Sequence, residues 1–221
     1  MRTLDVATRV KRQFGDESGS QITDAVILDW INDAQREIVN RNKEILQKKA
    51  TMATVNGTAN YALPTEIIRL HRVAYKGIAL NPISIQAAEQ DYPDKDLTPI
   101  PTGTPLEYWF FNNEINLRPA PATSSAADLT LYYERYPTDA SAIAGTDPTG
   151  TIDLPLQYHQ RVVEYCIAQA AELDDNDSRY ATKMAQFNSS LDDAQSDSFI
   201  RNQNVYPSIQ IAEEDSSYYA T

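Results

Sequence analysis

A chain of 221 residues is long enough for one domain, or for one domain with an insertion, and its 42% hydrophobic content can supply a sizeable core. The net charge of −12 argues against tight binding in a nucleic-acid groove, which needs clustered Lys and Arg side chains. The single cysteine, Cys166, excludes an intramolecular disulfide and a cysteine-based metal site.

The first residues, MRTLDVATRVKRQF, contain no continuous apolar segment, so we expect no secretory signal. No apolar run approaches the roughly 18 residues that a membrane-spanning helix needs. We therefore expect no membrane partner.

Two amphipathic helices are predicted at the start of the chain, over residues 3–14 and 23–46. In the second helix, apolar side chains recur at steps of three and four residues, and Thr23 is a good N-cap. Trp30, Ile31 and Ile38 are expected in the core. The opposite face of this helix is polar and carries charges of both signs.

A β-rich segment follows Lys49. Asn56-Gly57 lies between two alternating segments, residues 51–55 and 58–63, and predicts a β-hairpin with a type I′ turn. A short helix is predicted at 82–91, and further strands at 68–75, 78–80, 106–111, 114–118 and 128–136. In the last strand, Leu129, Leu131, Tyr133 and Arg135 are expected on one face.

Helical periodicity returns at Pro155 and predicts helices over 155–173 and 178–200. Residues 201–221 show no periodicity, include the acids Glu213, Glu214 and Asp215, and are predicted to be extended or disordered in isolation. The predicted fold is therefore α+β: a helical bundle of two N-terminal and two C-terminal helices, with an inserted antiparallel β-domain and an extended C-terminal tail. The predicted divisions are 1–48 with 152–200 for the bundle, 49–151 for the insertion, and 201–221 for the arm.

The residues that commonly carry catalysis are sparse and badly spaced. His71 and His159 stand alone, without the spacing of a metal-binding pair. Cys166 is about two helical turns from His159, too far for a direct hydrogen bond. With 7 glycines and no phosphate-loop motif, a phosphate cradle is also hard to build. We expect no catalytic site, no metal and no cofactor.

Two clusters admit a functional and a structural interpretation. Residues 174–177 are rich in Asp and suggest calcium, but they lack the order of a calcium-binding loop, and a helix break with an N-cap explains them better. Aromatic residues at 108–111, with Tyr132, Tyr133 and Tyr136, suggest a platform for stacking nucleic-acid bases. Sheet core, with some tyrosines at an interface, is favoured, because no basic residues were found near them in the sequence.

Four segments carry a resemblance to a known family. They are DWINDAQREIVNR, ANYALPTEIIRLHRVAYKGIAL, GTPLEYWFFNNEINLRPAPATSSAADLTLYYERYP and IDLPLQYHQRVVEYCIAQAAELDDNDSRYATKMAQFNSSL. In this order the chain resembles, over nearly residues 1–200, the head-to-tail adaptor (connector) proteins of tailed bacteriophages.

The resemblance implies a helical bundle with an inserted β-domain. It also implies a structural virion protein that forms a homo-oligomeric ring, typically of twelve copies. Such a ring docks on the portal protein, carries a downstream tail or nozzle protein, and extends the channel through which DNA passes without specific binding. The protein would then be assembled in the host cytoplasm and reside at the head–tail interface of the virion.

The resemblance gives two predicted surfaces. Family members often reach the portal with an extended C-terminal segment, which implies portal-binding candidates Val205, Tyr206, Pro207, Ile209, Ile211, Tyr218 and Tyr219. The polar face of the second helix supplies subunit-interface candidates Asp33, Arg36, Glu37 and Lys43. Two alternatives remain open at this point: a scaffolding or regulatory interaction module that forms no ring, and an enzyme.

Overall fold

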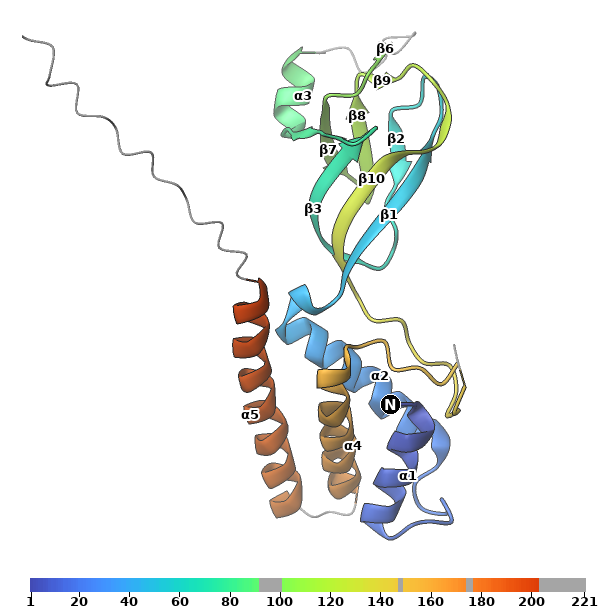
Figure 1. The fold of residues 1–221 in the computed structure, drawn as a ribbon, viewed down its shortest axis with the longest axis vertical. Coiled ribbons are helices and arrows are strands. Elements are labelled where there is room, and N and C mark those ends of the chain that lie inside the picture. The colour runs from blue at the N-terminus through green and yellow to red at the C-terminus, as the bar shows by residue number, and fades with distance from the viewer. Residues whose placement is uncertain (92–100, 147–148, 174–176, 203–221) are drawn as a thin grey trace, which may run out of the picture.

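The computed structural model describes residues 1–91, 101–146, 149–173 and 177–202. The molecule is elongated, with long helices at one end and strands at the other (Figure 1). We call α1, α2, α4 and α5 the helical module, and the strands together with α3 the β-module. The mixed α+β class predicted from the sequence is confirmed.

Helices from the two ends of the sequence pack against one another. The helical elements are α1 (Thr3–Phe14), α2 (Asp24–Arg41), α3 (Ile85–Asp91), α4 (His159–Leu173) and α5 (Asp177–Asn202), with 3₁₀ turns η1 (Lys43–Ile45) and η2 (Leu156–Tyr158). Helix α4 contacts α1 and α2 on one side and α5 on the other. The first predicted helix, residues 3–14, is confirmed at both ends.

The second helix is shorter than the sequence predicts. Thr23 caps it as expected, accepting a hydrogen bond from the Val26 N–H at 3.5 Å. The helix ends at Arg41 rather than at Leu46, because Asn42 leaves helical geometry with φ −131° and ψ 86°. The following residues form η1, and the chain already enters β1 at Gln47. The predicted helix was therefore five residues too long.

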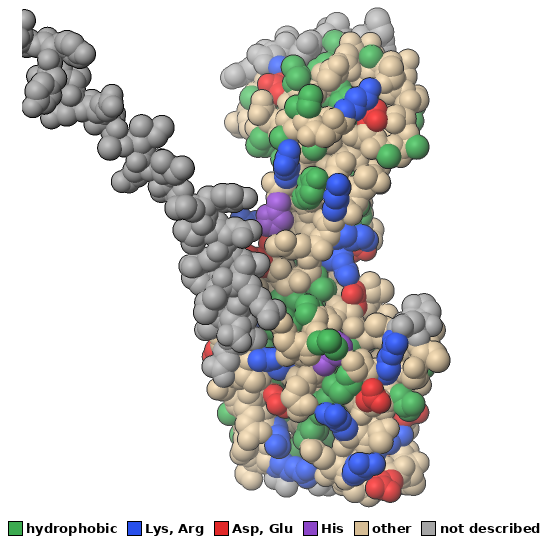
Figure 2. Space-filling model, in the orientation of Figure 1, with side chains coloured by type: hydrophobic (Ala, Val, Ile, Leu, Met, Phe, Trp, Pro, Cys, Tyr) green, Lys and Arg blue, Asp and Glu red, His purple; other side chains and the backbone are tan. Residues whose placement is uncertain are grey.

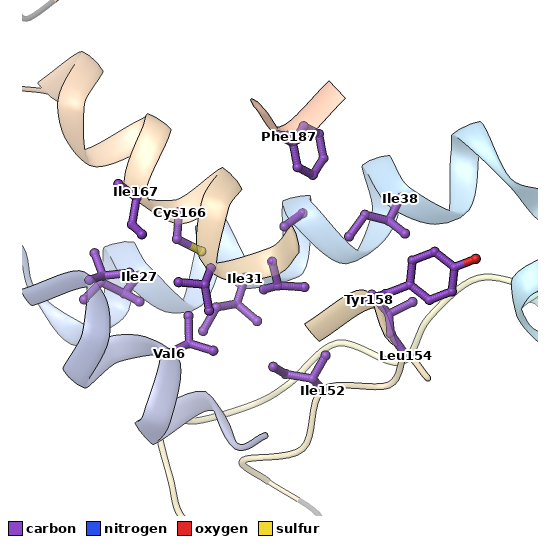
Figure 3. Close-up of a cluster of buried hydrophobic side chains, with 14 of the residues drawn as sticks. Val6, Ile27, Ile31, Ile38, Ile152, Leu154, Tyr158, Cys166, Ile167 and Phe187 are labelled. Atoms are coloured by element: carbon purple, nitrogen blue, oxygen red, sulfur yellow. The ribbon is translucent and has the colours of Figure 1, made fainter. Parts of the chain in front are cut away.

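The core of the helical module draws on both halves of the chain. Ile31 and Ile38 are fully buried as predicted, and Trp30 is half-buried against the same cluster. Figure 3 shows side chains of α1, α2, α4 and α5 meeting there, together with those from the segment before α4. The labelled members are Val6, Ile27, Ile31, Ile38, Ile152, Leu154, Tyr158, Cys166, Ile167 and Phe187. Neither terminal helical segment could bury its apolar stripe without the other.

The β-module consists mainly of two four-stranded sheets. Its strands are β1 (Gln47–Thr54), β2 (Asn60–Ala62), β3 (Ile67–Tyr75), β4 (Ile78–Ala79), β5 (Asn81–Pro82), β6 (Thr102–Gly103), β7 (Glu107–Phe111), β8 (Glu114–Arg118), β9 (Ala120–Pro121) and β10 (Ser125–Arg135). The sheet orders are β1-β10-β3-β4 and β2-β8-β7-β5, beside a short β6-β9 pair. Pairing is antiparallel except for the β5–β7 and β6–β9 pairs, which are parallel.

The hairpin predicted at Asn56-Gly57 is wrong as a strand pairing. A turn forms, with Gly57 at φ +77° and the Thr58 N–H bonded to the Val55 carbonyl at 3.1 Å, but Asn56 does not take the positive φ that the predicted type I′ turn requires. However, β1 pairs with β10, and β2 pairs with β8. This turn therefore carries the chain from one sheet to the other. By contrast, the strands predicted at 106–111 and 114–118 do pair with each other across Asn112 and Asn113, and both of these residues take the positive φ of a tight hairpin turn.

The two large sheets pack face to face over a second hydrophobic cluster. Leu129, Leu131 and Tyr133 of β10 are buried on one face, as predicted. They meet residues of the other sheet, among them Ile115 and Leu117 of β8. Strand β10 lies between β1 and β3, so it is the central strand of its sheet and its other face points away from this core.

A polar network joins the two modules where β10 ends. The Arg135 guanidinium holds both carboxylate oxygens of Asp153, with Nη2 to Oδ1 at 2.9 Å, and the Thr138 N–H donates to the same carboxylate at 2.7 Å. The Asp153 N–H donates to Oε1 of Gln35 at 2.6 Å. Gln35 is a fully buried polar residue of α2, so this network connects the last β-strand with the core of the helical module.

Candidate interaction surfaces

The polar side of α2 is partly covered by the chain itself. Arg36 forms ion pairs with Asp33 on the next turn and with Asp139 on the segment that follows β10. The neighbouring Asn32 side chain also holds this segment, through hydrogen bonds of 2.9 and 3.1 Å to the Ala140 backbone. Of these predicted interface residues, Asp33 and Arg36 keep about half of their side-chain surface exposed.

The other two interface candidates lie towards the end of α2. Glu37 binds Arg41 at 2.7 Å, and Arg41 continues to Asn188 of α5 at 2.7 Å. Lys43 is exposed in η1, beyond the end of the helix on which it was predicted. The four candidates therefore form no single bare surface: Glu37 belongs to a contact with α5, whereas Asp33 and Lys43 remain accessible.

The portal-binding candidates Val205, Tyr206, Pro207, Ile209, Ile211, Tyr218 and Tyr219 lie outside the described residues, which end at Asn202 of α5. Helix α5 ends at the level where the helical module meets the β-module (Figure 1). Any contact made by residues 203–221 therefore starts from this level of the molecule.

Cys166 and His159 have structural roles in the core of the helical module. Cys166 is fully buried, and this burial raises the pKa of its thiol well above the ordinary range. Both ring nitrogens of His159 are engaged: Nε2 lies 2.7 Å from the Leu154 carbonyl oxygen and Nδ1 lies 2.9 Å from the Met1 amino group. Burial is the main cause that lowers the pKa of His159. The two side chains thus have separate structural partners.

Within the described ranges, no group of three or more His, Cys, Asp and Glu side chains could hold a metal ion. Over the same ranges, no helix combines the length and apolar character that a bilayer crossing requires. Residues 174–176 of the Asp-rich cluster are outside the described residues, so the comparison of a calcium loop with a helix cap stays a prediction.

The outer face of the β1-β10-β3 sheet holds a charged cluster that sequence reasoning missed. Nε2 of His71 lies 2.9 Å from the carboxylate of the fully buried Glu134. Tyr132 lies two residues before Glu134 on β10, flanked by Lys49 of β1 and Arg72 of β3. An open pocket of about 340 Å³ adjoins them, lined by Gln47, Lys48, Lys49, His71, Tyr132 and Tyr133. Figure 2 shows basic side chains and a histidine near the narrow part between the modules.

The aromatic residues predicted to be sheet core divide into two groups. Tyr108 and Tyr133 are buried in the cluster between the sheets. Phe110 and Phe111 are exposed by 42% and 64%, beside the Asn112–Asn113 turn. The core interpretation is therefore right for the first pair and wrong for the second.

Comparison with known proteins decides the family. The family model described as SU10 adaptor protein matches residues 1–207. The chain belongs to this family of phage head-to-tail adaptors. The resemblance found in the sequence is thereby confirmed, and the family gives the adaptor a structural role in the virion. No curated protein matches the chain.

Family membership also bears on partners and chemistry. An adaptor of this family interacts with portal and tail proteins, and its structural role is consistent with the expectation that it is not an enzyme. The buried Cys166 and the engaged His159 agree with that role, because neither presents a reactive group to solvent.

Proposed function

We propose that this adaptor assembles as a homo-oligomeric ring, of about twelve copies as in related connectors, that docks on the portal and extends the DNA channel towards the tail. The observation that carries this proposal is the family match over residues 1–207. On this proposal the ring forms in the host cytoplasm and carries a downstream tail or nozzle protein. DNA passes through the lumen without specific binding, which the net charge of −12 favours through repulsion of phosphates.

The proposal assigns parts of the chain to different contacts. Residues 1–48 and 152–200 form the helical bundle, 49–151 the β-rich insertion, and 201–221 an arm that reaches the portal. Two separate hydrophobic clusters support the first two assignments. The arm's portal contact would come from Val205, Tyr206, Pro207, Ile209, Ile211, Tyr218 and Tyr219. Segments that bury little apolar surface alone can fold onto a partner.

Neighbouring subunits would meet along the accessible parts of α2 and η1. Asp33 and Lys43 are the candidates that remain exposed, whereas Arg36 and Glu37 contribute mainly by holding the local structure through their intrachain ion pairs. A contact in which one surface meets a different surface of the next copy closes into a ring when the rotation allows it.

The ring is tested by native mass spectrometry and negative-stain imaging, first of the adaptor alone and then with purified portal rings. We expect a closed ring in at least the second condition. A persistent monomer in both would refute the ring and favour an interaction module. K43E should prevent ring formation, whereas R12E, a matched charge reversal at an exposed site on α1, should not.

The arm is tested by ending the chain after Asn202, which leaves α5 intact. The shortened adaptor should keep its circular dichroism spectrum and no longer sediment with portal rings. Unchanged sedimentation would refute the assignment of the arm to the portal, without affecting the assignment of the ring.

A further inference from the structure

The outer face of the β1-β10-β3 sheet gathers cations that the fold leaves unpaired. Lys49, Arg69 and Arg72 are all exposed, and no described carboxylate forms an ion pair with any of them. The other described Lys and Arg residues on strands all have such a partner: Lys48 with Glu66, Arg118 with Glu107, and Arg135 with Asp153. We call Lys49, Arg69 and Arg72, together with Tyr132 between them, the basic face.

The strand register brings these side chains to one side of the sheet. Lys49 and Arg72 are the two residues paired with Tyr132, and Arg69 is paired with Glu134, two residues further along β10. Residues directly opposite one another, and those two apart on a strand, share a face. The register shift in β3 leaves His71 outside the strand pairing beside them, with its Nε2 atom 2.9 Å from the carboxylate of the buried Glu134. Three cations without a carboxylate partner thus share this face with a single buried carboxylate, that of Glu134.

The position of Tyr132 indicates which ligand chemistry suits this face. Lys49 Nζ lies 5.6 Å from the ring centroid and Arg72 Cζ lies 5.7 Å from it. These cations come from strands on opposite sides of β10, so both sides of the ring are already in use. A base therefore has no free ring face on which to stack, whereas an anionic group can bind the cations directly.

The chain supplies an anionic segment directly after α5. Residues 203–221 contain Glu213, Glu214 and Asp215 in a row and no Lys or Arg. Helix α5 ends at Asn202, at the level of the junction between the modules (Figure 1). Glu213 lies eleven positions after Asn202, and an extended chain of eleven residues spans up to about 36 Å. A tethered segment has an effective concentration of the order of millimolar, which favours it over a second copy in dilute solution.

We propose that, in the unassembled subunit, the acidic stretch Glu213–Asp215 binds the basic face of the same chain. The contact holds the C-terminal segment against the β-module before assembly. The consequence that portal binding displaces this stretch rests on the function proposed above; the contact itself does not.

Zero-length carbodiimide cross-linking of the full-length monomer tests the contact, because it joins a lysine to a carboxylate only when the two touch. Equal amounts of unlabelled and ¹⁵N-labelled protein are mixed and cross-linked, and all cross-linked species, monomeric and dimeric, are analysed by mass spectrometry. We expect links from Lys49 to residues 213–215 in which both linked peptides are unlabelled or both are ¹⁵N-labelled, because both come from the same chain. Links from the exposed Lys43 should be several-fold rarer.

Variants that leave both cross-linked groups intact give the sharper comparison. R72Q and R69Q should each reduce the Lys49 links by about two- to five-fold, the effect of removing one exposed cation from such a site. R12Q, which removes an equally exposed charge from α1, should leave them unchanged. Sodium chloride at high concentration should weaken the links, because it screens exposed charges.

Three results would overturn the proposal. The segment would have no preference for this face if Lys49 links were no commoner than Lys43 links. The same would follow if R72Q and R12Q changed the Lys49 links equally. Mixed light–heavy links would assign the contact to a second copy. The face would be assigned to nucleic acid if the adaptor bound fluorescent duplex DNA, if R72Q but not R12Q weakened this binding, and if no Lys49 links formed. The cross-linking uses no portal, so the two proposals can fail separately. Loss of the Lys49 links while rings still form would refute this contact alone. Lys49 links in an adaptor that forms no rings would refute the proposed function alone.

Discussion

The Arg135–Asp153 pair connects the two modules, and we predict that D153N separates their unfolding transitions. The pair lies at the end of β10, and the Asp153 backbone N–H continues the network to Gln35 of α2. Burial raises the pKa of Asp153, but hydrogen bonds from Arg135 and the Thr138 N–H outweigh it and lower the pKa overall. Asn at this position keeps the shape and removes the charge, and its amide group turns a donor towards Arg135 or Thr138.

The expected size of the effect follows from burial. Arg135 and Asp153 expose 17% and 26% of their side chains, so the pair is neither a surface salt bridge nor a fully buried one. Hydrogen bonds to charged groups contribute about 1.5–3 kcal/mol, and the substitution also leaves Arg135 partly buried without its counter-charge. We expect D153N to lower the free energy of unfolding by about 2–3 kcal/mol. At a typical urea dependence of about 1.5 kcal/mol per molar, the midpoint shifts by about 1.5 M.

The two tryptophans make the assay specific. Trp30 lies on α2 against the helical core, and Trp109 lies on β7, so each reports one module. Urea unfolding is followed by fluorescence in W109F and in W30F, each with and without D153N. We expect coincident midpoints with Asp153 in place, and separate midpoints once it is replaced.

The Arg36–Asp139 pair supplies the matched control, because Asp139 lies on the same connecting segment and the pair is exposed by 49% and 46%. D139N should cost no more than about 0.5 kcal/mol. If D153N shifted the midpoints no more than D139N does, the junction pair would not stabilise the protein. If the Trp30 and Trp109 transitions differed already with Asp153 present, the modules would unfold independently and the reasoning would fail.

Three further predictions concern the helical module. Phe187 is fully buried and packs edge-to-face on Tyr165, with 5.3 Å between the ring centroids. F187A should therefore lower the free energy of unfolding, measured in urea, by about 3–5 kcal/mol. F111A, at an exposed phenylalanine, should change it by less than about 0.5 kcal/mol. His159 has a lowered pKa in the folded state, so stability should fall as pH drops below about 6.5, where the unfolded chain takes up the proton first; thermal melts of H159Q should lose this dependence. The hydrogen bond from the Ile22 N–H is the main cause that lowers the pKa of Asp16, so the ionised carboxylate stabilises the folded state. D16A should therefore reduce the melting temperature above about pH 4, and progressively less at lower pH. E17A, the control, should leave the melting temperature unchanged.

The helices were largely predictable because their signals are local. The apolar stripe and the Thr23 cap located the start of α2, and the periodicity that returns at Pro155 located α4 and α5. The end of α2 was missed because the apolar residues Ile45 and Leu46 continue its periodicity after Asn42 has left the helix. Periodicity records which residues are buried, and it does not record which element buries them.

Strand order was less predictable because it depends on pairing between distant segments. Asn56-Gly57 correctly signalled a turn, but a turn does not require that its two arms pair. β1 instead pairs with β10, and its register with β10 places Lys49 beside Tyr132. These residues are 83 positions apart, so no local pattern could have joined them.

The same non-local pairing limits what net charge can exclude. A net charge of −12 describes the average of the chain, and the aromatic residues were judged separately to lack basic neighbours in the sequence. β10 lies between two strands that each bring a cation to Tyr132, so the fold concentrates positive charge on one face of an acidic protein. Such a face attracts acidic segments, and the chain itself holds one within reach. The acidity that argued against a nucleic-acid partner is thus also an argument for an internal one.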